Sequence, residues 1–174
     1  MKPVMIRAAT LPALFALGAC ATTSQTSHTG GATAQPQAIT LSVGPCFGFC
    51  PVYELTVDAA GGVVFQGSRH TAILGERRRR VSPATYATLA ADLARFKPTA
   101  DTSSPVECTA AVSDTSAYTV TWSEGGDRKV VAVSQSGCPG GPAHDMNRVL
   151  RDMPDRLGVA DWAKQTTRPG EGRG

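Results

Sequence analysis

Residues 52–67, VYELTVDAAGGVVFQG, indicate the fold more directly than any other part of the sequence. Their first half alternates apolar and polar residues, which is typical of a strand with one buried face. The apolar members of that half are Tyr53, Leu55 and Val57. Residues 60–62 have the composition of a turn, and the apolar residues 63–65 follow it. The stretch therefore predicts a β-hairpin.

A second hairpin is predicted over residues 118–134, where alternating residues flank the pair Gly125-Gly126. Centring the turn on this pair places position 118 opposite position 133. A further strand is expected at the N-terminal side, where Ile39, Leu41 and Val43 alternate with smaller or polar residues. Residues 72–75 suggest a bent edge strand.

Two helices are expected. Ser82-Pro83 combines a capping hydroxyl with a proline at the first helical position. Apolar residues at helical spacing follow this start, namely Tyr86, Leu89, Leu93 and Phe96. The second helix is expected from about Pro142 to Met153, with Pro154 ending or kinking it. Its apolar face would consist of Met146, Val149, Leu150 and Met153. The sequence thus predicts an α+β domain with an antiparallel sheet of two hairpins plus an N-terminal strand, and two helices packed on one face.

The N-terminus looks like that of a bacterial lipoprotein. Lys2 and Arg7 precede a short apolar stretch that ends in Leu17-Gly18-Ala19-Cys20, a pattern that resembles a lipobox. The resemblance implies a signal peptide over residues 1–19 and diacylglycerol, with palmitate-type acyl chains, on Cys20. An ordinary secreted protein cleaved near Ala21 is the alternative.

The predicted organisation after the signal has three parts. Residues 20–38 are the lipidated cysteine and a flexible tether, because they lack charge and apolar bulk. Residues 39–164 form a single α+β domain, and residues 165–174 form a disordered tail. Because Ala21, and not aspartate, follows the cysteine, we expect an outer-membrane lipoprotein facing the periplasm.

The charge of the chain limits its partners. The net charge of the whole chain is +3 at pH 7, and loss of Lys2 and Arg7 with the signal leaves the mature protein nearly neutral. Such a balance argues against a nucleic-acid partner. The expected partners are the membrane, through the lipid on Cys20, and another envelope protein.

Lipidation of Cys20 leaves four cysteines in an oxidising compartment, which favours disulfides. Three connectivities exist, and we favour Cys46–Cys50 with Cys108–Cys138. An extended chain would hold Cys46 and Cys50 about 13 Å apart, so that pair requires a turn around Gly48. The second bond would join the open end of the second hairpin.

The spacing Cys46-x-x-x-Cys50-Pro51 also resembles that of copper-delivery proteins of thioredoxin type. That resemblance implies a thiol-redox or copper site, with His70 or His144 as a third ligand. We prefer the structural disulfide and no cofactor, because hairpins replace the alternating strands and helices of that fold.

The four consecutive arginines, Arg77, Arg78, Arg79 and Arg80, are the only charge cluster. They could contact anionic lipid headgroups or an acidic partner. A solvated sheet edge that discourages association between sheets is the simpler interpretation.

From about Ile39 to Trp162 the chain resembles a family of small bacterial envelope proteins, many of them lipoprotein-like, catalogued as a domain of unknown function. The resemblance rests mainly on the opening Cys-Phe-Gly-x-Cys-Pro-x-Tyr, residues 46–53. Further matches are Gly61, Gly62, Gly67, the helix that begins at Ser82, and Asp114-Thr115. The family resemblance implies no catalytic residue. The sequence itself also contains no recognisable catalytic motif. The function we expect is that of a lipid-anchored, non-enzymatic binding or structural domain.

Overall fold

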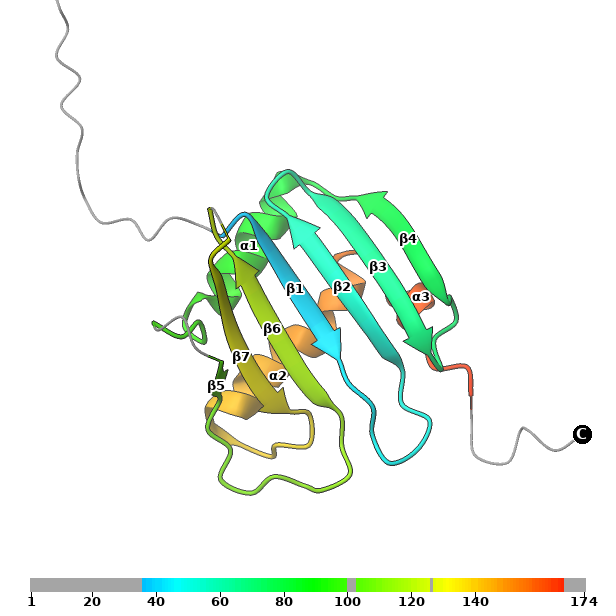
Figure 1. Cartoon of the computed structure of the whole chain (residues 1–174), viewed down its shortest axis with the longest axis vertical. Coiled ribbons are helices and arrows are strands. Elements are labelled where there is room, and N and C mark those ends of the chain that lie inside the picture. The colour runs from blue at the N-terminus through cyan, green and yellow to red at the C-terminus, as the bar shows by residue number, and fades with distance from the viewer. Residues whose placement is uncertain (1–35, 100–102, 126, 168–174) are drawn as a thin grey trace, which may run out of the picture. The chain divides into compact units, whose positions relative to one another are not determined.

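Seven strands form one sheet in the order β4-β3-β2-β1-β6-β7-β5 (Figure 1). The computed structural model describes residues 36–99, 103–125 and 127–167, all within the compact unit Thr33–Gly174. The strands are β1 (Ala38–Val43), β2 (Val52–Asp58), β3 (Gly62–Arg69), β4 (Gly75–Arg80), β5 (Ser104–Pro105), β6 (Ala117–Ser123) and β7 (Lys129–Gln135). Neighbouring strands are antiparallel except β5 and β7, which are parallel.

Strand β1 lies at the centre of the sheet and pairs with β2 on one side and β6 on the other. Leu41 is directly opposite Leu55 of β2 and Val120 of β6, and all three side chains are fully buried. The neighbouring row of Val57, Ile39 and Trp122 is buried in the same way. Because alternate residues of a strand face opposite sides, these rows form a continuous apolar face across the sheet.

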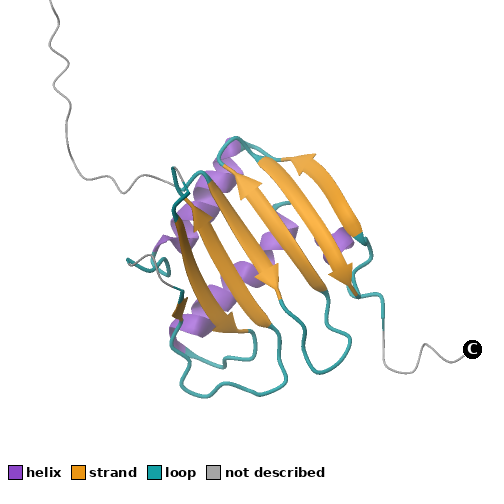
Figure 2. Cartoon of the chain, viewed as in Figure 1, coloured by secondary structure: helices purple, strands orange, loops and turns teal. Residues whose placement is uncertain are grey.

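Three helices cover this apolar face and leave the other face open (Figure 2). They are α1 (Pro83–Ala94), α2 (Gly141–Arg156) and the short α3 (Ala160–Ala163). On the open face Thr40 and Thr56 form a hydroxyl–hydroxyl hydrogen bond of 2.8 Å. The predicted α+β class, with helices on one face, is therefore confirmed.

The sheet is larger than two hairpins and one strand, so that part of the prediction is wrong. Strand β4 extends the first hairpin to three strands, and the two-residue β5 makes the sheet mixed. The expected edge strand at residues 72–75 is misplaced, because the strand begins at Gly75 and contains the arginines. Ala72 and Ile73 instead donate backbone hydrogen bonds to Lys164 and Trp162.

The second hairpin differs from the prediction by one residue, since Tyr118 is opposite Ser134 and not position 133. Its loop is longer than a two-residue turn: Ser123 pairs with Lys129, and Glu124 N–H donates to the Arg128 carbonyl at 2.9 Å. A shift of one residue moves every partner to the other face of a strand. As a result Ser134, and not Val133, lies on the helix-covered face with Tyr118, which shares that face with Val120 and Trp122 and is opposite Val43.

Both predicted helices are present. The Ser82 hydroxyl accepts a hydrogen bond from the Thr85 N–H at 3.2 Å, as an N-cap does. Helix α2 continues through Pro154 to Arg156, so the proline does not end it. Within the three described ranges, no helix has the length and hydropathy needed to cross a membrane.

Several predictions fall on residues outside the described ranges. These are the signal peptide at 1–19, Cys20 with the tether as far as residue 35, and the tail at 168–174. Of the predicted tail, residues 165–167 are described: Gln165 bridges Thr71, and Thr166 N–H donates to the His70 carbonyl at 3.1 Å.

A buried polar pair joins α2 to β7. Asn147 is fully buried; its amide donates to the Gln135 carbonyl at 2.7 Å and accepts from the Ser134 hydroxyl at 2.8 Å. We expect Asn147→Ala to lower the free energy of unfolding by about 1–3 kcal/mol, because the buried Ser134 hydroxyl loses its acceptor and the Gln135 carbonyl loses one of its donors. Urea denaturation measures the change. Thr88→Ala, on the exposed side of α1, is the control and should change stability by less than about 0.5 kcal/mol. Equal stability of the two variants would contradict the role of this pair.

Candidate binding site at the loop end of the sheet

Four connections meet at one end of the sheet: residues 44–51, 70–74, 106–116 and 136–140 (Figure 1). A pocket of about 340 Å³ lies at this end. Its lining includes Cys46, Cys50, Pro51 and Tyr53 from the cysteine-rich opening, and Asp114 and Thr115 from a segment about 60 residues later. Val43, Ser116, Tyr118, Ser136 and Ala163 complete it. The two sequence motifs therefore form one site.

The register of β1 brings the two tyrosines of the pocket together. Val43, the last residue of β1, is opposite Tyr53 in β2 and opposite Tyr118 in β6. Backbone hydrogen bonds then continue beyond the strands: Gly44 N–H donates to the Ala117 carbonyl at 2.9 Å, and Phe47 N–H to the Asp114 carbonyl at 3.1 Å. The first loop is thus held against the segment before β6.

Burial raises the pKa of both phenols. For Tyr53 burial has the largest effect and nearby Tyr118 adds to it, so the pKa lies far above the usual value of about 10. For Tyr118 burial also raises the pKa, while Arg151 acts in the opposite direction. Both side chains are therefore neutral at physiological pH and can donate a hydrogen bond to a ligand.

Cys46 and Cys50 are joined in a disulfide, with their Cα atoms 5.7 Å apart. Gly48 has φ +146°, a conformation that favours glycine, and Gly48 N–H donates to the Cys46 carbonyl at 3.0 Å. The turn predicted around Gly48 is therefore present. The five-residue ring constrains the wall of the pocket to which Cys46 and Cys50 contribute.

Cys108 and Cys138 form the second disulfide, with Cα atoms 5.9 Å apart. The preferred pairing of the four cysteines thus agrees with the distances in the structure. Next to this bond, Gly137 N–H donates to the Thr115 hydroxyl at 3.3 Å. A Cβ on Gly137 would lie 2.7 Å from Thr115 Cγ2 and 3.1 Å from Val112 Cβ, so a larger residue here would require these side chains to shift. The bond therefore supports the wall that contains Thr115.

The ligand set of the copper alternative is not assembled in this structure. The Cys46 and Cys50 sulfurs are bonded to each other, and His70 Nδ1 contacts the Thr167 hydroxyl at 3.0 Å. The His70 ring lies edge-on to Phe49, with centroids 5.3 Å apart. His144 Nδ1 lies 3.2 Å from the Cys138 carbonyl. In the described part of the chain, no three His, Cys, Asp or Glu side chains are grouped as metal ligands.

Large apolar side chains at the loop end are exposed. Phe47, at the tip of the disulfide ring, is 89% exposed, and Phe49 is 40% exposed. Val112 and Leu74, on the neighbouring loops, are 56% and 63% exposed. Exposed apolar side chains gathered at one end of a domain are typical of an interaction surface.

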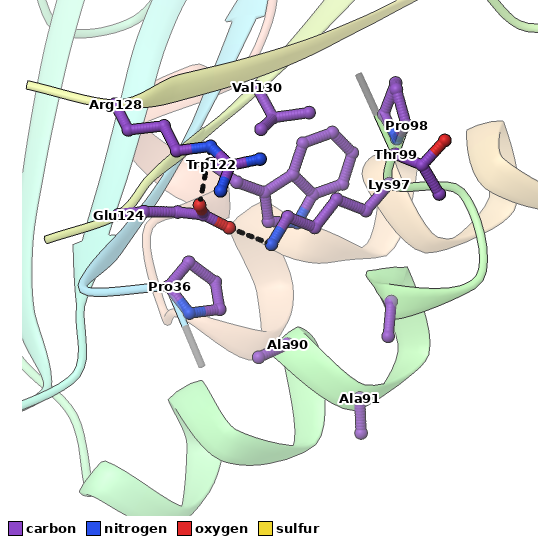
Figure 3. Close-up of a pocket in the computed structure, with 11 residues that line it drawn as sticks. Pro36, Ala90, Ala91, Lys97, Pro98, Thr99, Trp122, Glu124, Arg128 and Val130 are labelled. Carbon is purple, nitrogen blue, oxygen red and sulfur yellow. Dashed lines mark hydrogen bonds and ion pairs between the residues drawn. The ribbon is translucent and has the colours of Figure 1, made fainter. Parts of the chain in front are cut away.

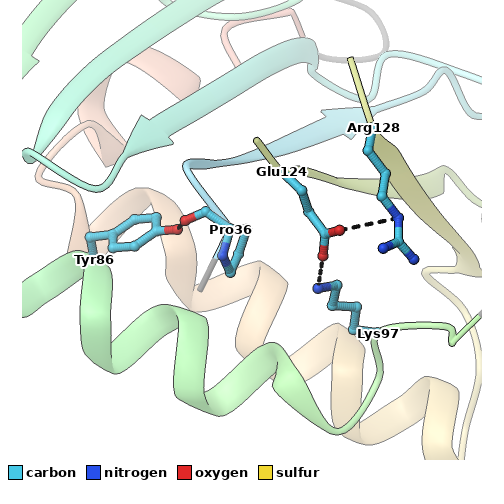
Figure 4. A network of polar contacts seen from close by, with 5 residues as sticks. All are labelled: Pro36, Tyr86, Lys97, Glu124 and Arg128. Carbon is cyan, nitrogen blue, oxygen red and sulfur yellow. Dashed lines mark hydrogen bonds and ion pairs between the residues drawn. The ribbon is translucent and has the colours of Figure 1, made fainter. Parts of the chain in front are cut away.

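A larger pocket of about 550 Å³ lies between the end of α1 and the β6–β7 hairpin (Figure 3). Trp122, Val130 and alanines of α1 form its apolar part. Its charged groups bind one another, since Glu124 contacts both Lys97 and Arg128, the latter at 3.2 Å (Figure 4). Beside it the buried Tyr86 hydroxyl donates to the Pro36 carbonyl and attaches the start of the domain to α1. Neither sequence motif contributes to this pocket.

The arginine cluster lies on β4, at the opposite edge from β5 and away from both pockets. All four side chains are exposed. Only alternate arginines share a face, as expected for a strand.

Several residues of the loop-end pocket were missed by the sequence reasoning, namely Ser116, Tyr118, Ser136 and Ala163. The place of Tyr118 in the pocket follows from the pairing of β6 with β1, which no local pattern indicates. Ala163 was missed because the short helix α3 carries no periodic signal in four residues.

The two disulfides should contribute different amounts to the stability of the domain. Replacing both cysteines of a pair with serine should cost about 2 kcal/mol for Cys46/Cys50 and about 3–4 kcal/mol for Cys108/Cys138, because the second bond closes a much longer loop. Denaturation of the two double variants measures this order.

Thiol counting on the mature protein should find no free thiol, and glutathione should leave the Cys46–Cys50 bond intact. A labile bond, or stoichiometric copper lost on Cys50→Ser, would contradict the structural role.

Comparison with known proteins gives a family and no activity. Residues 37–153 match the model of a family described as "Domain of unknown function (DUF6438)". No curated protein matches the chain. The match covers all of the described sheet and most of α2. The chain therefore belongs to the DUF6438 family of domains of unknown function.

Proposed function

We propose that the protein is a lipid-anchored, non-enzymatic binding domain of the bacterial envelope, and that its loop-end pocket holds another envelope protein. One observation carries the proposal: residues 46–53 and 114–115, far apart in sequence, line the same pocket. Fold requirements alone explain a buried apolar row, but they do not explain why motif residues surround an open pocket.

The chemistry of the lining supports binding more than catalysis. Its polar groups are neutral hydroxyls, from Tyr53, Tyr118, Thr115, Ser116 and Ser136, together with the single carboxylate of Asp114. A general acid–base pair needs two groups with suitably different pKa values; burial raises the pKa of both tyrosines further from neutral pH, and Asp114 is the single carboxylate beside them. Hydroxyl donors beside Val43, Pro51 and a disulfide instead suit a side chain with an apolar body and a polar end.

Exposed Phe47 extends the pocket into a surface. A fully exposed phenylalanine at the tip of a constrained ring loses little conformational entropy when a partner covers it. Aromatic side chains contribute strongly to interfaces because of the apolar area that they bury. Phe47 and the pocket together therefore suit a protein partner.

The end of the sheet that the tether would join is consistent with lipid anchoring through Cys20. Ala38, where β1 begins, lies at the end of this strand opposite Val43 and the loop end. Strand β1 separates the two ends by about 17 Å. A tether joined at Pro36 would leave the loop end accessible from the periplasm, with the protein at the outer membrane.

A thiol-redox or copper-handling activity of Cys46 and Cys50 is the second candidate. It is favoured by the position of the two cysteines, which line the pocket and are partly exposed residues, so that a reductant could reach their bond. The thiol and copper measurements described above distinguish it from the binding function.

Site-specific photo-crosslinking in living cells tests the binding function. A photoreactive phenylalanine analogue at position 47 should give one discrete adduct with an envelope protein. Tyr118→Trp, which fills the pocket, should reduce that adduct at least fivefold, because the partner can no longer insert a side chain. The same analogue at Asp152, on the outer side of α2, is the matched control and should give no such adduct.

A second arm of the experiment tests the anchor. Cys20→Ser should move the folded protein from the membrane fraction to the soluble periplasm. Retention in the membrane fraction would contradict lipid anchoring, and an adduct unaffected by Tyr118→Trp would contradict the role of the pocket.

A further inference from the structure

Within the described residues, strand β4 leaves one row of backbone hydrogen-bonding groups without a strand partner. Val81 N–H donates to the Gly61 carbonyl at 2.9 Å, which fixes the pattern of the β3–β4 ladder. In an antiparallel ladder every second residue of a strand bonds to the same neighbouring strand. Because Val81 bonds to β3, Arg79 and Arg77 also direct their N–H and C=O groups toward β3. Glu76, Arg78 and Arg80 therefore direct theirs outward, at the edge of the sheet.

The two edges of the sheet differ in how they resist the addition of another strand. The β5 edge is only two residues long and includes Pro105, which has no N–H to donate. Strand β4 is six residues long, has no proline and pairs with β3 in an unbroken register. Among the described residues, charged side chains are the only one of the usual protections against strand addition that the β4 edge has.

The charge of this edge is positive on both sides of the sheet. Arg77 and Arg79 are opposite Phe65 and Val63, which places them on the helix-covered side, and Arg78 and Arg80 lie on the open side. Arg78 pairs with Glu76 at 2.6 Å. Arg79 donates to the Gly158 carbonyl, Arg80 to the Ala60 carbonyl at 3.3 Å, and Arg77 to the Glu76 carbonyl at 2.8 Å. Among the described residues, none of these last three pairs with a carboxylate.

We infer that β4 is a docking edge for an extended acidic segment of another protein, which adds as an eighth strand. The backbone groups of Glu76, Arg78 and Arg80 supply the hydrogen bonds, and the arginines select a segment rich in carboxylates. The same charges repel a second copy of β4, so the edge discriminates between partners. The incoming strand displaces Arg77 from the Glu76 carbonyl and frees its guanidinium for a carboxylate.

Arginines on both sides of the sheet favour a strand over a membrane as the partner. A flat bilayer surface contacts one side of a sheet, which would use two of the four arginines. A strand that adds at the edge carries side chains on both sides and can pair with all four. The site lies apart from the loop-end pocket, so its test is independent of the proposed function.

Residue-resolved amide hydrogen exchange tests the inference. The full mature chain, made with Cys20→Ser so that no detergent is needed, is mixed with a capped octapeptide of the repeat Glu-Glu-Val-Val, whose adjacent glutamates point to both sides of the added strand. The amides of Glu76, Arg78 and Arg80 should exchange at least tenfold more slowly, and those of Arg77 and Arg79, already bonded to β3, should change little. Raising the salt concentration from 50 to 500 mM should weaken binding, because the pairs are exposed.

Matched controls distinguish strand addition from electrostatic attraction alone. The same peptide N-methylated throughout keeps its charge but cannot form the ladder, so it should give no alternating protection. Arg78→Pro removes an outward N–H and should abolish binding, whereas Arg78→Gln should weaken it and keep the alternation. Equal binding of the methylated peptide, protection without alternation, or binding to phosphatidylglycerol vesicles in place of the peptide would overturn the inference.

Discussion

The double pairing of β1 is the constraint on which the rest of the structure depends. Because β1 pairs with β2 and β6 in one register, the buried rows through Leu41 and Ile39 continue across the sheet, and the helices cover them. The same register ends at Val43 between Tyr53 and Tyr118. A shift of one residue would break both the core and the pocket, since every side chain would change face. Stability and site geometry therefore have the same origin.

Local patterns in the sequence were sufficient for the elements with a buried face. The alternation in residues 53–57 and the cap at Ser82 correspond to β2 and α1 as observed. Strand β4 was predicted only approximately, as an edge strand at residues 72–75 and a solvated edge at the arginines, because four arginines show no apolar alternation. Strand β5 was missed because two residues are too short for any pattern. The order of the strands could not be predicted from the sequence either, because pairing between β1 and β6 joins residues about 80 positions apart and depends on the whole core.

The candidate site was predictable in its parts but not in its assembly. The cysteine spacing and the turn at Gly48 indicated the first disulfide, and the position of the other two cysteines near the open end of the second hairpin indicated the second. What joins the motifs is a set of backbone hydrogen bonds between loops, such as that from Phe47 to Asp114, and these depend on strand register. The hairpin alignment was wrong by one residue because the loop after Ser123 is longer than a two-residue turn. That error paired Tyr118 with Val133 in place of Ser134.

The central claim is that the loop-end pocket, and not the larger pocket beside α1, is the binding site. Chemical-shift mapping of the oxidised protein with a library of small aromatic and hydroxylated fragments tests it most directly. The account predicts that bound fragments shift the amides of Val43, Tyr53, Thr115 and Tyr118, and that reduction of Cys46–Cys50 abolishes these shifts. Fragments that instead shift Lys97, Trp122 and Val130, with no dependence on the disulfide, would contradict it.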